Sequence, residues 1–171
     1  FDWPRFRTRL EGELERLEGV YRRLLKESGV ETFDARARLR DAHTVELADG
    51  RRFTARHVLI ATGGRPQRLD IPGAELAMIS DDLFTMDRVP GRVLVIGGGF
   101  IACEFATILQ GIGAQVTQIH RGDAVLRGFD GEMRRLVGEQ LAEIGVTLRL
   151  ETEALRLDRQ GDGIAVTLTD G

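Results

Sequence analysis

Residues 92–102 read Arg92-Val93-Leu94-Val95-Ile96-Gly97-Gly98-Gly99-Phe100-Ile101-Ala102 and join an apolar run to a glycine triplet. The apolar run predicts a buried strand, and the pattern after the triplet predicts a helix over residues 100–110. The glycines match GxGxxA, in which Gly97 allows a tight turn, Gly99 lets a pyrophosphate approach the backbone, and Ala102 keeps the helix close to the strand. Free N–H groups at the helix N-terminus then hold the phosphates. The stretch therefore predicts a dinucleotide-binding turn.

A second strand over residues 115–120 completes a βαβ unit. Beyond it the pattern predicts a helix over 131–144, a strand over 146–150, and a hairpin that pairs 155–157 with 164–169. We therefore expect an α/β fold with a Rossmann-like domain over residues 91–171, truncated at its C-terminal end.

The end of the second strand selects the nicotinamide cofactor, because an acidic side chain there binds the ribose hydroxyls of NAD and repels a 2′-phosphate. This position is His120, followed by Arg121 and, six residues further on, by Arg127. Two guanidinium groups that keep their charge can bind the phosphate, so the sequence favours NADP. The alternative interpretation is that both arginines are solvated loop residues.

The first ninety residues follow a different pattern. Apolar residues at intervals of three and four predict one amphipathic helix over residues 4–28. Short strand-like segments over residues 30–54 predict a β-meander, and the apolar residues 57–61 predict a fully buried strand. Residues 66–91 hold three of the four prolines and are interpreted as a connection between two lobes. We place the domain boundary near Gly91.

Composition narrows the functional classes. The chain has 171 residues, 24 basic and 27 acidic, and a formal net charge of -3. No overall field attracts nucleic acid or an anionic membrane, and no run reaches the length of about 18 apolar residues that a membrane span needs. The single cysteine, Cys103, excludes an internal disulfide framework and favours a cytoplasmic setting. The start at Phe1 is neither a signal peptide nor an initiator methionine, and we expect the chain to be an internal piece of a longer protein.

Three segments together resemble the glutathione reductases of the pyridine nucleotide-disulfide oxidoreductase family. They are ATGGRP at residues 61–66, the glycine motif at 97–104, and HRGDAVLRGFD at 120–130. The resemblance covers essentially the whole chain, and residues 1–90 resemble the later part of that family's FAD-binding domain. It implies a homodimeric parent enzyme in which NADPH reduces FAD, and the flavin then reduces an active-site disulfide that cleaves glutathione disulfide.

The resemblance also implies roles for individual residues. Thr62 and Gly63 would lie against FAD, and Ala37 in the meander would contact its adenine. Glu104 would pair near the flavin with a lysine upstream of residue 1, and Ile101 would pack beside the nicotinamide cofactor. Each has a structural alternative: a loop that turns the chain, an acidic residue that favours the first helical turn, or an ordinary core side chain.

Departures from the family are informative. Phe100 stands where glutathione reductases usually have a tyrosine that covers the nicotinamide pocket, and Ala35 replaces an expected glycine of the meander. Cys103 is not a redox cysteine, because the family's pair is separated by four residues in an upstream segment. The redox pair, the first FAD motif and the catalytic histidine are not in this sequence. We therefore assign no catalytic residue and no metal site, and expect this polypeptide alone to be inactive.

Several other functions remain open. Trypanothione reductase, dihydrolipoamide dehydrogenase and mercuric reductase are alternatives within the family, although His120 argues against the lipoamide enzyme, which normally has an acidic residue there. A non-catalytic nucleotide-binding module or a sensor is an alternative from another class.

Overall fold

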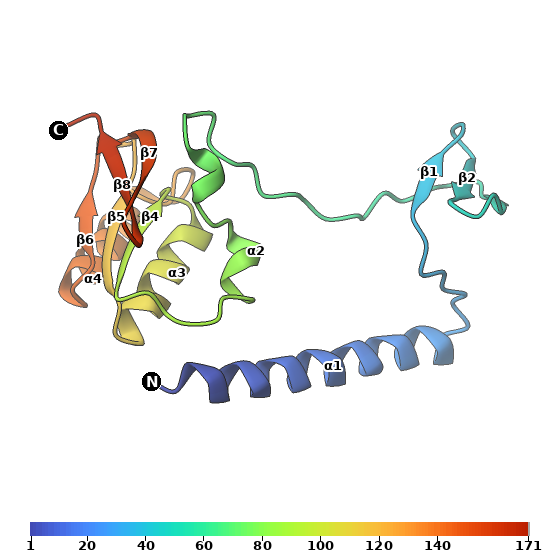
Figure 1. Ribbon diagram of the computed structural model, residues 1–171. Helices are drawn as coiled ribbons and strands as arrows, with labels where there is room; N and C mark the ends of the chain where they lie inside the picture. Colours follow the sequence, from blue (N-terminus) through green and yellow to red (C-terminus); the bar gives the residue numbers. More distant parts are fainter. Residues whose placement is uncertain (171) are drawn as a thin grey trace. The chain divides into compact units, whose positions relative to one another are not determined.

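The computed structural model describes residues 1–170, and the chain divides into two compact units (Figure 1). The meander unit comprises residues 8–65. The parallel-sheet unit comprises residues 1–7 and the chain from residue 66 onward. The structure thus groups the connection 66–91 with the parallel sheet, whereas the division of cofactor roles near Gly91 stays a prediction.

The glycine triplet lies inside a βαβ unit. Strand β4 (Arg92–Ile96) leads through the turn into α3 (Phe100–Gly111) and then β5 (Gln115–Ile119). β4 and β5 run parallel with Arg92 opposite Gln115 and Ile96 opposite Ile119, so the two strands end at the same level. This register brings the glycine turn beside the residues that follow β5. The predicted α/β fold is confirmed here.

The remainder of the unit extends this sheet. Helix α4 (Gly131–Glu143) precedes β6 (Thr147–Arg149), which pairs parallel to β5 and gives the order β4-β5-β6. Strands β7 (Ala154–Gln160) and β8 (Gly163–Leu168) form a separate antiparallel hairpin, as predicted.

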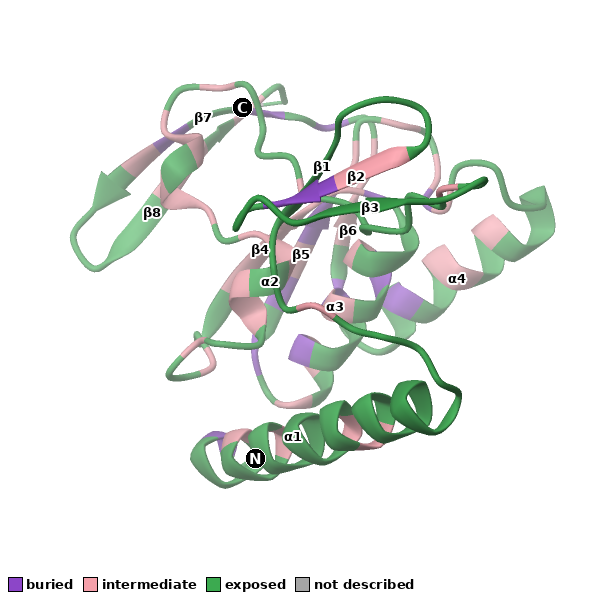
Figure 2. Cartoon of the chain, turned by 90° about the vertical axis from the view of Figure 1, so that its right-hand side faces the viewer, coloured by how far each residue is buried: buried purple, intermediate pink, exposed green. Residues whose placement is uncertain are grey.

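The core of this unit lies between the sheet and its helices (Figure 2). Its buried residues are Cys103, Ala106, Leu109, Ala114, Val116, Val125, Leu141 and Val146. Val125 belongs to the loop after β5 and is only 1% exposed. Val125 therefore anchors this loop in the core, although the residues on either side of Val125 are partly exposed.

The connection over residues 66–91 contains a short 3-10 helix, η1 (Ala74–Leu76), and the α-helix α2 (Ser80–Leu83). The backbone N–H of Leu157 donates to the carbonyl of Pro72 at 2.9 Å, which ties the connection to β7. At its other end the indole Nε1 of Trp3 donates to the carbonyl of Met86 at 2.8 Å. These bonds explain why the connection belongs to the parallel-sheet unit.

The meander unit contains most of α1 (Trp3–Glu27) and three short antiparallel strands in the order β1-β2-β3. The strands are β1 (Ala37–Leu39), β2 (Thr44–Leu47) and β3 (Arg52–Thr54). Both the helix and the meander were expected from the sequence. No helix within residues 1–170 is long and apolar enough to cross a membrane.

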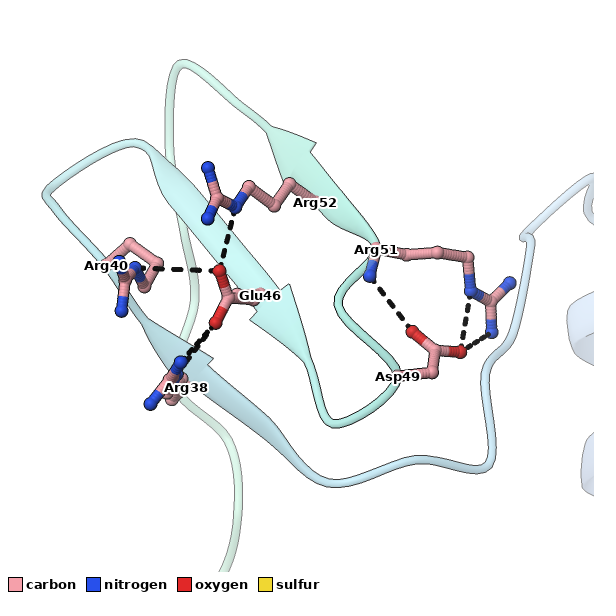
Figure 3. Close-up of polar contacts among 6 residues, drawn as sticks. All are labelled: Arg38, Arg40, Glu46, Asp49, Arg51 and Arg52. Atoms are coloured by element: carbon pink, nitrogen blue, oxygen red, sulfur yellow. Dashed lines mark hydrogen bonds and ion pairs between the residues drawn. The ribbon is translucent and has the colours of Figure 1, made fainter.

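A buried carboxylate connects the three strands of the meander (Figure 3). Glu46 on β2 lies opposite Arg38 on β1 and Arg52 on β3. Arg38 donates to Oε1 from Nε at 2.9 Å and also from Nη2, and Arg52 Nε donates to Oε2 at 2.7 Å. Hydrogen bonding from Arg38, followed by that from Arg52, lowers the pKa of Glu46 to about 2. The carboxylate therefore stays charged and fixes the register of the sheet.

The predicted buried strand over residues 57–61 is wrong. This segment has no regular secondary structure, and Leu59 and Ile60 are 87% and 67% exposed. A buried strand needs neighbours that accept and donate its backbone hydrogen bonds. Among the described residues no strand pairs with this segment, so Leu59 and Ile60 face solvent.

Candidate dinucleotide-binding site

The first glycine of the motif is fixed from two sides. Its N–H donates to the carbonyl of Ile119 at 2.9 Å, and its carbonyl accepts from Nε2 of Gln118 at 3.0 Å. Gly97 has φ 137°, a conformation that side chains with a Cβ rarely adopt. A Cβ built at this position would lie 3.5 Å from Cβ of Ala102. The turn therefore lies directly against the helix that follows, as the motif requires.

The start of α3 suits an anion. Gly99 is the N-cap and provides no side chain to bind the free N–H groups of the first helical turn. A Cβ built at Gly99 would meet no atom within 4 Å, so the space over the second motif glycine is open. Free donors, the positive end of the helix dipole and this open approach fit the pyrophosphate of a dinucleotide.

His120 packs against the turn rather than extending into solvent. A Cβ at Gly98 would overlap three atoms of the His120 ring, so glycine is the residue that fits at position 98. Burial, and then the positive charges of Arg121 and Arg134, lower the pKa of His120 below 6.5. The imidazole is therefore neutral near pH 7, and the positive charge for a phosphate has to come from arginines.

Arg121 contributes to a hollow of about 370 Å³ at the carboxyl ends of β4 and β5. The hollow is lined by Leu69, Ile96, Gly97, Gly98, Ile119, His120, Arg121, Thr152, Glu153 and Ala154. Backbone bonds hold its far wall, because Thr152 N–H donates to the carbonyl of His120 and Glu151 N–H to that of Gly122, both at 3.1 Å. The structure thus brings Gly97, His120 and Arg121 together.

Arg127 does not line this hollow but lies on the same loop. Its neighbour Leu126 donates its N–H to the carbonyl of Gly98 at 2.6 Å. Arg127 is exposed, as is Arg121, and neither has an ion-pair partner among residues 1–170. Both guanidinium groups are therefore available to a ligand.

The other predicted cofactor residues of α3 are dispersed along its first turns. Phe100 is 57% exposed at the helix start, and Ile101 lines a second, open cleft of about 990 Å³ together with Gly99 and Ala102. Glu104 is exposed and lines neither hollow. The roles of these residues stay predictions.

The residues expected to contact flavin lie in the meander unit. Ala37 is the first residue of β1 and pairs with Leu47, whereas Thr62 and Gly63 lie in an exposed segment without regular structure. Their contact with FAD stays a prediction.

Gln118 is a site residue that the sequence did not reveal. It is fully buried on β5, and Nε2 lies 3.0 Å from the carbonyl of Gly97 and 3.6 Å from Sγ of Cys103. Because the carbonyl requires a donor, the amide can adopt only this orientation, which leaves Oε1 without a partner among the described residues. Burial raises the pKa of the Cys103 thiol, which supports a packing role for this cysteine.

Curated relatives of this chain include glutathione reductases and a thioredoxin reductase. It is 43% identical over 169 residues to glutathione reductase of Burkholderia cepacia, covering 99% of this chain and 37% of that protein. It is 38% identical over 168 residues to mitochondrial thioredoxin reductase 2 of Drosophila melanogaster, covering 95% of this chain and 32% of that protein. The chain thus spans about a third of the length of these curated relatives.

A solved structure has the same fold. The HOCl-induced flavoprotein disulfide reductase of Escherichia coli superposes with a TM-score of 0.86 and 20% identity, covering all of this chain and 40% of that one. The family match extends over residues 3–171. The chain therefore belongs to the pyridine nucleotide-disulphide oxidoreductase family.

Proposed function

We propose that this chain forms the NADPH-binding part, and a portion of the FAD-binding part, of a glutathione reductase. When bound, NADPH supplies a hydride to FAD, and the reduced flavin passes electrons through a protein disulfide to glutathione disulfide. The residues of this chain bind and orient the cofactors for that transfer. The 43% identity to a glutathione reductase supports this substrate.

The residues after β5 carry the proposal of NADPH. The backbone of the glycine turn and the first turn of α3 bind the pyrophosphate, which NADPH and NADH share. Arg121 and Arg127 bind the 2′-phosphate, which only NADPH has. This assignment is supported by a neutral His120 where NAD enzymes have an acid, and by two exposed guanidinium groups on the loop that follows it.

The remaining predicted residues position the two cofactors relative to each other. Phe100 covers the nicotinamide pocket, supported by its exposure at the mouth of the turn, and Ile101 packs beside the cofactor. Glu104 lies near the nicotinamide end. In the meander unit, Ala37, Thr62 and Gly63 contact FAD, which is supported by the sequence resemblance alone.

We further infer that the parent enzyme is a cytoplasmic homodimer, as its resemblance to glutathione reductases implies. A second candidate is a thioredoxin reductase, because the Drosophila relative of that name is 38% identical. Both candidates bind NADPH through the same residues of this chain and differ in the disulfide they reduce.

The test uses the full-length flavoprotein that contains this chain. Oxidation of NADPH is followed at 340 nm, roughly the absorbance maximum of reduced nicotinamide, with either glutathione disulfide or oxidised thioredoxin as acceptor. We expect turnover with glutathione disulfide and a clear preference for NADPH over NADH. Turnover with thioredoxin only would support the second candidate. A protein that binds neither nucleotide would overturn both.

A further inference from the structure

A third arginine holds the loop that carries Arg121 and Arg127. Arg134 lies on α4, and its side chain is only 24% exposed. Nε donates to the carbonyl of Val125 at 2.8 Å, and Nη2 donates to the carbonyl of Ala124 at 2.9 Å. Nη2 also lies 3.3 Å from Oδ1 of Asp123. One guanidinium group thus binds three consecutive residues of the loop.

The next residue of the loop is anchored to the glycine turn. Leu126 donates its N–H to the carbonyl of Gly98, and its φ of 56° lies in the left-handed region that a leucine rarely adopts. Such a conformation persists only where surrounding contacts impose it. Leu126 is held by its own bonds to Gly98 and Phe129, and Arg134 adds to them by binding the three residues immediately before it.

The far end of the loop is fixed as well. Asp130 caps α4, with Oδ1 accepting from the N–H groups of Glu132 and Met133 at 2.9 and 3.4 Å. Phe129 N–H donates to the carbonyl of Leu126 at 3.1 Å. Arg127 therefore begins from a backbone that is held on both sides, while its own side chain is free to reach a ligand.

We propose that Arg134 is a positioning residue that sets the preference for NADPH by holding residues 123–126 and thereby placing Arg127. This inference rests on the proposed function, because it concerns the same 2′-phosphate site. Arg134 acts through the loop, since its Nε and Nη2 donate to acceptors of residues 123–125. Leu126 links the loop to Gly98, but Gly97 of the pyrophosphate site is held by its own bonds to Ile119 and Gln118. We therefore expect the effect to fall mainly on ligands that carry the 2′-phosphate.

The experiment compares Arg134→Met with Arg135→Met in the full-length protein. Arg135 is the matched control, because it is the next residue on α4, is 69% exposed and pairs only with Glu139 one turn away among the described residues. Calorimetric titration under anaerobic conditions of the fully reduced enzyme, whose flavin accepts no further hydride, measures the affinity of 2′,5′-ADP, which carries the 2′-phosphate, and of NADPH and NADH. If the competent loop falls to roughly a tenth of the population, affinity for phosphate-bearing ligands falls about tenfold. NADH affinity should change less than about twofold, and Arg135→Met should behave as wild type.

A second comparison separates positioning from direct phosphate binding. In a background of Arg121→Met and Arg127→Leu, no cofactor arginine remains to be placed, so Arg134→Met should cause no further loss of NADPH affinity. A further loss in that background would overturn the positioning role and indicate a direct contact. Equal losses for NADPH and NADH from Arg134→Met alone would also overturn it.

The proposed function fails in a different way. If wild-type protein binds NADH as tightly as NADPH, the 2′-phosphate site itself is absent. If wild type prefers NADPH and Arg127→Leu removes that preference while Arg134→Met keeps it, only the positioning role is wrong. Arg134→Lys retains the charge but loses the planar fork that binds two carbonyls, so it should fold and lose part of the preference. An unchanged preference in Arg134→Lys would overturn the inference even if Arg134→Met does not fold.

Discussion

Removal of the two cofactor arginines tests the proposed 2′-phosphate site directly. A charge-assisted hydrogen bond contributes about 1.5 to 3 kcal/mol. Arg121 and Arg127 are both exposed, so solvent and salt screen them and the lower value applies. About 1.5 kcal/mol corresponds to roughly tenfold in affinity, so Arg121→Met or Arg127→Leu alone should lower the affinity for NADPH about tenfold. If the two contributions add, the double variant should lose about a hundredfold.

The assay is the ratio of kcat/KM for NADPH to that for NADH in the full-length enzyme. NADH lacks the phosphate, so its kcat/KM should hardly change. Adding His120→Glu supplies an acceptor for the ribose hydroxyls and should invert the preference while binding is retained. In the wild type, added salt should weaken the binding of NADPH more than that of NADH, and this difference should be absent from the arginine variants. Equal losses for both cofactors in the arginine variants would refute phosphate selection and return both residues to the solvated-loop interpretation.

Three further predictions concern single side chains. Phe100 is 57% exposed, so Phe100→Ala should cost less than about 1 kcal/mol in unfolding free energy but alter flavin reduction by NADPH in stopped-flow traces; a large loss of stability with unchanged kinetics would make it a core residue. Glu46 has a folded pKa of about 2, below its usual 4.5, so its stabilising charge should be lost as the pH falls from 4.5 towards 2. In Glu46→Gln, the free energy of unfolding measured with denaturant should depend less on pH across that window. An unchanged pH dependence would contradict a stabilising role for the cluster. His120 has a folded pKa below 6.5, so unfolding free energy should fall as the pH drops through 6.5, and His120→Gln should remove that dependence; persistence of the dependence would assign it to another group.

The βαβ unit was predictable because its signals are local. Four apolar residues and three glycines place a strand and a turn, and residues 115–120 place a second strand, without knowledge of the remaining chain. The structure has β4 and α3 beginning at Arg92 and Phe100, as expected. The hairpin of β7 and β8 was similarly visible, because its turn residues are flanked by apolar alternation.

Features that depend on distant partners were not predictable. An apolar run such as residues 57–61 has the composition of a buried strand, but its burial depends on neighbouring strands that the run itself cannot specify. Gln118 lies between Thr117 and Ile119 on β5, and only the folded turn shows that its amide binds the carbonyl of Gly97. Arg134 has the sequence pattern of a solvated charge on a helix. Its proposed positioning role depends on its bond to the carbonyl of Val125, which lies nine residues earlier in the loop before α4.

We therefore propose that different kinds of structure bind the pyrophosphate, which NADPH and NADH share, and the 2′-phosphate, which only NADPH has. Pyrophosphate binding uses backbone groups at the junction of β4 and α3. The register of β4 with β5 and the bonds to Gly97 fix the geometry of this junction. Discrimination uses long side chains on a loop that depends on a few bonds from α4. Changes in the loop can then shift cofactor preference while the affinity for the shared part is kept. A change at Gly98 cannot, because any Cβ there displaces His120 and disturbs both parts together.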